Sequence, residues 1–157
     1  MTYINNLKYR YLFKSYIRGQ YGLKLKICST QLRELTNKAM ESSLERVFIG
    51  IGHLTEKELI VEEIDECLNI SENPETLFKA DPLCIYTVYK KAESLNKTIV
   101  LLVHTHPESP EPSLLDIRNM KTWLIPWLII SSLTGESKVW MCRDGKPIEI
   151  PVELNNC

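Results

Sequence analysis

Apolar residues occur along this chain with two kinds of spacing, one typical of strands and one typical of helices. In seven segments the apolar residues alternate with polar ones or form short unbroken runs, which is typical of strands. These strands are expected at residues 23–28, 46–52, 58–66, 98–103, 126–131, 138–143 and 148–154. Helical spacing, with apolar residues three or four positions apart, occurs at residues 30–43, 82–96 and 113–122. Because the strands follow one another locally and do not alternate regularly with helices, the pattern predicts an α+β fold: one curved mixed sheet flanked by helices.

Proline and glycine mark where several elements begin and end. Asp81-Pro82 predicts a helix start, since Asp caps a helix and Pro is pre-set for its first turn. Asp144-Gly145 predicts a tight turn between the last two strands. Pro151 lies within the final predicted strand, and its missing N–H restricts that strand to a sheet edge or requires a bulge.

The composition indicates one globular domain preceded by a basic arm. The 157 residues carry a formal net charge of -1, and 44% of them are apolar, which suffices for one packed core. Residues 1–22 hold four basic residues, no acidic residue and five of the seven tyrosines. We therefore expect an N-terminal arm at residues 1–22 and the domain at residues 23–157. A basic aromatic arm can bind nucleic acid, but packing of the arm against the domain is the favoured interpretation, and the balanced charge of the whole chain argues against a nucleic-acid partner.

The sequence also argues against a membrane or secreted protein. No apolar run reaches the roughly 20 residues of a membrane-spanning helix, and the first residues lack the apolar core of a signal peptide. The five cysteines are widely spaced, contain no C-x-x-C pair and are not needed to staple a chain of this length. We expect a cytoplasmic protein with reduced thiols, no membrane partner and no cysteine-based zinc site. The sequence does not predict the oligomeric state.

The strongest chemical signal follows the predicted strand at residues 98–103, where the motif H-T-H-P contains His104 and His106. Residues two apart on a strand point to the same side, so both imidazoles aim at one point. Asp116 lies in the first turn of the next predicted helix, within reach of that point. Two histidines and a carboxylate leave one position of a zinc ion open, which is the catalytic pattern, and zinc lowers the pKa of water toward 7. Without a metal, the same residues are two ordinary strand histidines and a helix cap formed by Ser113 and Asp116.

The whole pattern resembles the JAMM metalloproteases, also called MPN-plus proteins. It consists of H-T-H-P, a short proline-rich loop and S-x-x-D, with a glutamate upstream at the start of a buried strand that ends in glycine. Glu45 occupies that upstream position, before the stretch R-V-F-I-G-I-G. The resemblance is to compact archaeal-type members and covers residues 23–154. It implies a cytidine-deaminase-like three-layer arrangement of helices and sheet.

The resemblance also implies a reaction and a role for each residue. Members of the family hydrolyse the isopeptide bond after the C-terminal glycine of a ubiquitin-like modifier. By this resemblance, the ligands of one Zn²⁺ per chain are His104, His106 and Asp116. Glu45 carries a proton from water to the leaving amine, and Ser113 donates a hydrogen bond to the oxyanion. The extended tail of the modifier is expected to add as a strand at a sheet edge.

This chain departs from the family pattern in one loop. Between His106 and Ser113 it has six residues, 107–112, where the family usually has seven. The position of Asp116 therefore decides whether the site is complete. The loop at residues 68–80 is of modest length, as in a minimal catalytic domain without large substrate clamps. Two alternatives stay open: an enzyme that trims the C-terminus of a sulfur-carrier protein, and a metal-free scaffold of the MPN-minus kind.

Overall fold

The computed structural model describes residues 22–157, and the predicted arm at residues 1–22 lies, apart from Gly22, outside this range. Within residues 22–157 the chain forms three helices and eight strands. The strands are β1 (Lys24–Cys28), β2 (Val47–Leu54), β3 (Glu58–Cys67), β4 (Thr98–His106), β5 (Trp127–Ser131), β6 (Ser137–Arg143), β7 (Lys146–Ile150) and β8 (Val152–Asn155). The helices are α2 (Ser29–Met40), α3 (Pro82–Ser94) and α4 (Leu114–Met120). The predicted α+β class is confirmed.

All eight strands belong to one mixed sheet with the order β7-β6-β5-β4-β2-β3-β1-β8. β4 lies near the middle, where it pairs with β2 in antiparallel and with β5 in parallel orientation. Residues 99–105 of β4 are all buried, because the fold covers both faces of this strand. The sheet is thus curved and mixed, as the sequence predicts, and the histidine motif ends its most buried strand.

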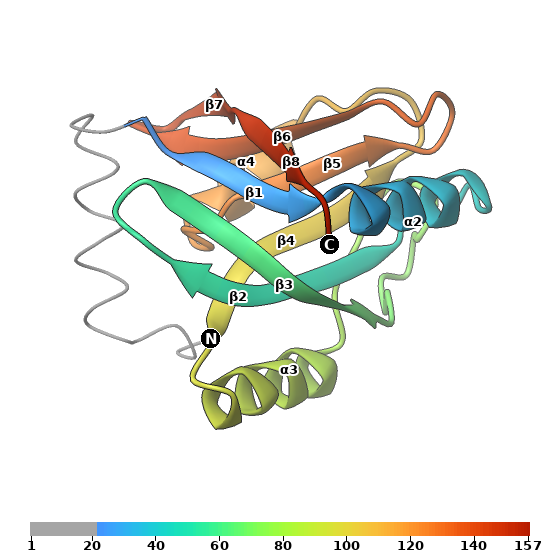
Figure 1. Cartoon of the computed structure of the whole chain (residues 1–157). Coiled ribbons are helices and arrows are strands. Elements are labelled where there is room, and N and C mark those ends of the chain that lie inside the picture. The colour runs from blue at the N-terminus through green and yellow to red at the C-terminus, as the bar shows by residue number, and fades with distance from the viewer. Residues whose placement is uncertain (1–21) are drawn as a thin grey trace.

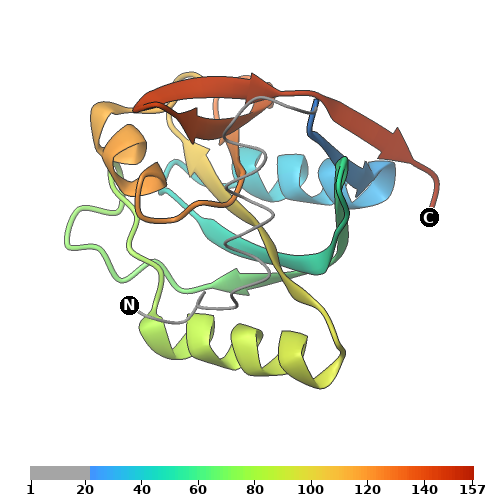
Figure 2. The ribbon, with the colours of Figure 1, turned by 90° about the vertical axis from the view of Figure 1, so that its left-hand side faces the viewer.

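The last segment of the chain differs from the prediction of a single strand at residues 148–154. Pro151 divides it into β7 and β8, which lie at opposite edges of the sheet. Pro151 has no N–H for the ladder, but its carbonyl accepts a hydrogen bond from the Leu25 N–H at 2.9 Å. Because one residue separates the two edge strands, the sheet must curl until its edges meet at this corner. Figure 2 shows β7 and β8, in red, following one another along the upper rim.

Helices cover the curled sheet on two sides. α3 packs against β2, β3 and β4, while α2 packs against β1 and β5 inside the curl (Figure 1). α2 buries Leu35 and Ala39, and α3 buries Val88 and Ala92. This helix–sheet–helix order agrees with the three layers expected from the resemblance. None of the described helices is both long and apolar enough to cross a membrane.

The expectation of reduced thiols is wrong for four of the five cysteines. A disulfide bond joins Cys67 at the end of β3 to Cys84 in α3, and another joins Cys28 to Cys157. The Cα atoms of these pairs lie 5.7 Å and 5.6 Å apart, respectively, a separation usual for disulfides. The spacing of cysteines along the sequence does not indicate these bonds, because the sheet and not the local chain brings the partners together.

The bonding pattern predicts the number of reactive thiols. Within residues 22–157, Cys142 is the one free cysteine. Protein purified without reductant and then unfolded should therefore show one thiol per chain in a colorimetric titration, and five after reduction. Three thiols before reduction would exclude one of the two bonds, and five would exclude both.

Gly52 allows β2 to pass close to β3. The register between the two strands shifts between Ile51 and Gly52, and a Cβ atom on Gly52 would clash with the carbonyl oxygen of Ile60. Since a backbone atom cannot move aside, Gly52→Ala should lower the free energy of unfolding by about 3 kcal/mol. The melting temperature should then fall by roughly 6–12 °C. Gly22→Ala is the control, because a Cβ there meets nothing within 4 Å; equal melting temperatures would contradict the close approach.

Candidate metal centre

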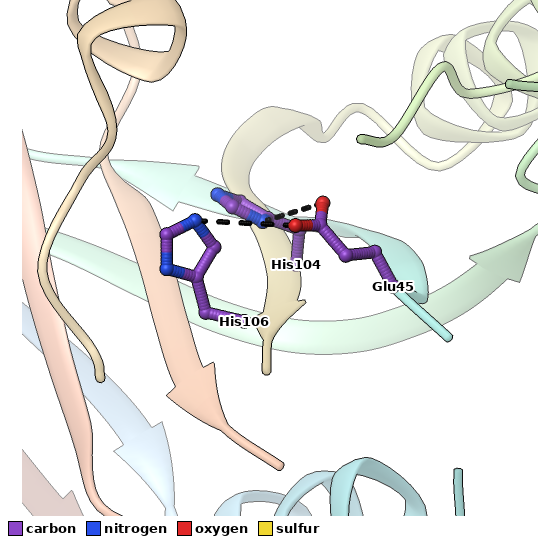
Figure 3. Close-up of side chains that lie close together, drawn as sticks. All are labelled: Glu45, His104 and His106. Atoms are coloured by element: carbon purple, nitrogen blue, oxygen red, sulfur yellow. Dashed lines mark ion pairs between the residues drawn. The ribbon is translucent and has the colours of Figure 1, made fainter. Parts of the chain in front are cut away.

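β4 and the segment before β2 bring three of the predicted site residues together. β4 ends with His104 and His106, whose side chains leave the strand on the same side. β2 runs antiparallel to β4 with Val47 opposite His104, so the residues that precede β2 lie alongside the two histidines. Glu45 is thereby placed next to both rings, with only 3% of its surface exposed. Figure 3 shows its carboxylate turned toward them.

Asp116 reaches the same place from the first turn of α4. Ser113 and Asp116 cap this helix reciprocally: the Ser113 hydroxyl accepts from the Asp116 N–H at 3.1 Å, and the Asp116 carboxylate accepts from the Ser113 N–H at 2.8 Å. The carboxylate oxygens lie 3.3 Å from Nε2 of His106 and 3.5 Å from Nε2 of His104. The six-residue loop at 107–112 therefore does not carry Asp116 away from the histidines.

Glu45 approaches the histidines from a different direction. Its carboxylate lies 3.7 Å from Nδ1 of His104, the ring nitrogen opposite the one that faces Asp116, and 4.0 Å from Nε2 of His106. One ligand atom from each of Glu45, His104 and His106 lies within 4.8 Å of the others, which is close enough to hold a metal ion. His106 is the member of this group with a solvent-exposed edge, since 17% of its side chain is exposed and that of His104 is fully buried.

Imidazole and carboxylate donors are types that zinc prefers. The group close enough to hold a metal ion is Glu45, His104 and His106, and Asp116 adds a second carboxylate beside both rings. Asp116 approaches the two imidazoles through different oxygens: Oδ1 lies 3.5 Å from Nε2 of His104 and Oδ2 lies 3.3 Å from Nε2 of His106. Two ligands about 2 Å from a tetrahedral zinc ion lie roughly 3.3 Å apart. Nε2 of His104 is buried and has no hydrogen-bond partner within the described residues, so its lone pair is available to a metal. Nδ1 of His106 lies 3.1 Å from the Ser109 carbonyl. A donated hydrogen bond there leaves Nε2 as the ligand atom.

The charges of the site are coupled. The hydrogen bond to Asp116 raises the pKa of His106 above its usual value. Burial acts to raise the pKa of Asp116, but the hydrogen bond with His106 and the proximity of His104 outweigh burial, and the pKa is lowered. The carboxylate is therefore ionised at neutral pH next to an imidazole that holds its proton more tightly than usual. A metal cation bound by these groups would displace that proton.

Aromatic side chains that no motif indicates pack against His104. The Phe78 ring stacks on the His104 ring with centroids 4.4 Å apart, and Trp127 of β5 meets it edge-on at 5.8 Å. Phe78 comes from the loop between β3 and α3, where the sequence shows no periodicity. Its position follows from the fold of that loop, so no spacing in the sequence identifies it. These contacts hold the imidazole in one orientation.

The fold and the convergence of these side chains define a protein of the JAMM type. More particularly, this chain belongs to the prokaryotic homologues of the JAB domain, whose family model matches residues 30–143. The resemblance inferred from the motif is thereby confirmed.

Known relatives and a solved structure agree with this assignment. The probable TtuB-protein conjugate cleaving protease of Thermus thermophilus is 27% identical over 136 residues, which are 85% of this chain and 86% of the relative. A desampylase of Pyrococcus furiosus is 33% identical over 72 residues, 45% of this chain and 51% of the relative. The solution structure of protein DSY2949 from Desulfitobacterium hafniense has the same fold, with a TM-score of 0.75 at 21% identity. That similarity covers 85% of this chain and 94% of the other.

Proposed function

We propose that this chain is a zinc-dependent isopeptidase that cleaves after the C-terminal glycine of a ubiquitin-like or sulfur-carrier modifier. The observation that carries the proposal is that the Asp116 carboxylate lies within 3.5 Å of both His104 and His106, with Glu45 beside the same rings. The relatives named as a conjugate-cleaving protease and a desampylase support this class of substrate. Two histidines with two carboxylates beside them support an enzyme over a metal-free scaffold.

In this proposal His104, His106 and Asp116 hold the zinc ion, which when bound supplies Lewis acidity toward water and the scissile carbonyl. Glu45 accepts a proton from the attacking water at a carboxylate oxygen. It then gives that proton to the nitrogen of the departing lysine side chain, so the amine leaves neutral and Glu45 is again ionised. The exposed edge of His106 indicates the side from which the substrate enters.

In the same proposal, Ser113 donates a hydrogen bond to the oxygen of the scissile carbonyl as this oxygen becomes negative. Its hydroxyl oxygen accepts the Asp116 N–H, and a serine hydroxyl that accepts a hydrogen bond can still donate its own hydrogen. Donation to the developing oxyanion would strengthen in the transition state, which is the condition for acceleration. The helix cap and the proposed catalytic role of Ser113 are therefore compatible.

The proposal is tested with defined conjugates. A panel of ubiquitin-like and sulfur-carrier proteins ending in Gly-Gly is prepared in two forms: linked through an isopeptide bond to a lysine of a reporter protein, and extended by a short linear peptide. The full chain, purified without a histidine tag, is analysed for zinc and incubated with both. Cleavage of the isopeptide form after the terminal glycine is expected. Cleavage of the linear form alone would favour carrier processing, and zinc-loaded protein that cleaves neither would contradict the proposal.

A further inference from the structure

Glu45 lies between two regular elements, so its own peptide groups need partners outside them. α2 ends at Met40 and β2 begins at Val47. A buried backbone N–H or carbonyl without a hydrogen bond is costly. The Glu45 N–H donates to the Pro74 carbonyl at 2.6 Å, and the Glu45 carbonyl accepts from the side-chain amide of Asn69 at 2.8 Å. Both partners belong to the loop between β3 and α3, far from Glu45 in the sequence.

The amide of Asn69 uses all of its hydrogen-bonding groups in this place. Nδ2 donates to the carbonyls of Glu45 and Leu77, at 2.8 and 3.0 Å. Oδ1 accepts from the backbone N–H groups of Ser71 and Lys79, at 3.0 and 2.9 Å. Among side chains this short, asparagine can donate twice and accept twice, whereas aspartate has no donor and serine has only one. One of the four bonds crosses to the site, and the other three hold the loop itself.

The loop that carries Asn69 is anchored at both ends. The Cys67–Cys84 disulfide closes it, and the Ile70 N–H donates to the Lys79 carbonyl at 2.8 Å. From the same loop, Phe78 stacks on His104. The loop thus touches the site twice, once at the backbone of Glu45 and once at the ring of a histidine. Because the loop is anchored, its hydrogen bonds to Glu45 fix the position of the Glu45 backbone and therefore of its carboxylate.

The flanking peptide groups of Glu45 are held from the opposite side by β4. Thr105, between the two histidines, accepts the Arg46 N–H at its hydroxyl oxygen at 2.8 Å, and its own N–H donates to the Arg46 carbonyl at 3.0 Å. These bonds tie the chain after Glu45 to the histidine strand. The Glu45 residue itself depends on the loop, through Asn69 and Pro74.

We infer that Asn69 is a positioning residue: through the Glu45 carbonyl it keeps the Glu45 carboxylate in its place beside the imidazoles, where it would meet the attacking water. This inference rests on the proposed function of the site. A displacement of about 1 Å at a reacting group can cost about 100-fold in rate. Loss of the Asn69 bond is therefore expected to lower kcat and to leave both KM and zinc content unchanged.

Asn69→Asp is the decisive variant. Aspartate has the same size and keeps the oxygen that accepts from Ser71 and Lys79, but it cannot donate to the carbonyls of Glu45 and Leu77. The double-mutant cycle below separates the loss of the Glu45 bond from the loss of the Leu77 bond. Ser71→Ala is the matched control, because the Ser71 hydroxyl accepts a bond within the loop, from the Asn73 N–H at 3.2 Å. With a conjugate that the wild type cleaves, Asn69→Asp should lower kcat by about 10- to 100-fold. KM should stay within about twofold of wild type, and Ser71→Ala should match wild type in both constants.

A double-mutant cycle separates positioning from general destabilisation. If Asn69 acts through Glu45, Asn69→Asp should cost nothing further in a Glu45→Gln background. A purely structural role would lower the residual rate by the same factor in both backgrounds. An undiminished effect in the Glu45→Gln background, or an Asn69→Asp kcat equal to that of Ser71→Ala, would overturn the inference.

A measurement without substrate distinguishes failure of this inference from failure of the proposed function. Amide hydrogen exchange of Glu45, followed by NMR in the zinc-loaded full chain, reports whether the loop holds this residue. Asn69→Asp should accelerate exchange of the Glu45 N–H about 10-fold or more relative to Ser71→Ala, as expected for a local opening. If the wild type cleaves no conjugate, the proposed function fails, and unchanged exchange would then overturn the role of Asn69 as well.

Discussion

Glu45→Gln is expected to retain zinc and to lose about 10²–10⁴-fold in kcat. Glutamine has the same shape and can occupy the same buried position, but its neutral amide cannot accept the proton of the attacking water. Glu45 lies 3.7 and 4.0 Å from the imidazoles, farther than the 3.3 and 3.5 Å of Asp116. This difference is the reason for proposing proton transfer for Glu45 and metal ligation for Asp116. The measurement combines steady-state hydrolysis of an isopeptide conjugate with elemental analysis of zinc.

The zinc content of Glu45→Gln decides between two roles for this carboxylate. Glu45 is close enough to both histidines to be a ligand itself. Loss of zinc together with activity would make it a ligand, and full activity with zinc retained would remove it from the mechanism. Glu41→Gln is the matched control, because the Glu41 side chain is 67% exposed and interacts with Arg46 at the surface. That variant should equal wild type in both measurements.

His106→Ala should lose zinc and lower the melting temperature. A ligand that binds only the folded chain adds about 2.7 kcal/mol at a free concentration of 100 times its Kd. Loss of that contribution corresponds to a melting temperature roughly 5–11 °C lower for a domain of this size. The substitution also removes the partner of the Asp116 carboxylate, which lies 3.3 Å from Nε2 of His106. Differential scanning calorimetry with and without added zinc makes the comparison.

A chelator provides the sharpest form of this test. Chelation should lower the melting temperature of the wild type toward that of His106→Ala and leave the variant itself unchanged. His53→Ala is the control histidine, because His53 is 49% exposed and pairs with Glu62 at the surface, a pair worth about 0–1 kcal/mol. It should bind zinc as the wild type does. An unchanged zinc content in His106→Ala would remove His106 from the ligands.

The sequence predicts the elements and the central motif well because their signals are local. The strand that leads into His104 and His106 is an unbroken apolar run, and Ser113 and Asp116 have the spacing of a helix cap. Neither conclusion depends on distant contacts. Glu45 is harder to predict, since a carboxylate before a strand is ordinary. Only the resemblance to a known motif singles it out.

The edge strands and the cysteines were beyond local prediction for the same reason. Pro151 signals an interruption, but the sequence does not say that the chain crosses there from one sheet edge to the other. That crossing depends on how far the whole sheet curls. Likewise Cys67 and Cys84 meet because α3 packs back against the end of β3.

The amino-acid sequence alone predicts the α+β elements, the buried strand that ends in the two histidines, and the helix cap in the pattern of a JAMM site. It can do so because periodicity and short motifs are properties of neighbouring residues. The tertiary structure decided that Asp116 reaches the histidines despite the shorter loop. It also decided that Phe78 covers His104 and that Asn69 holds Glu45. These contacts join residues from separate elements and loops. The register of β2 against β4 and the course of the loops create them, and no local pattern encodes either.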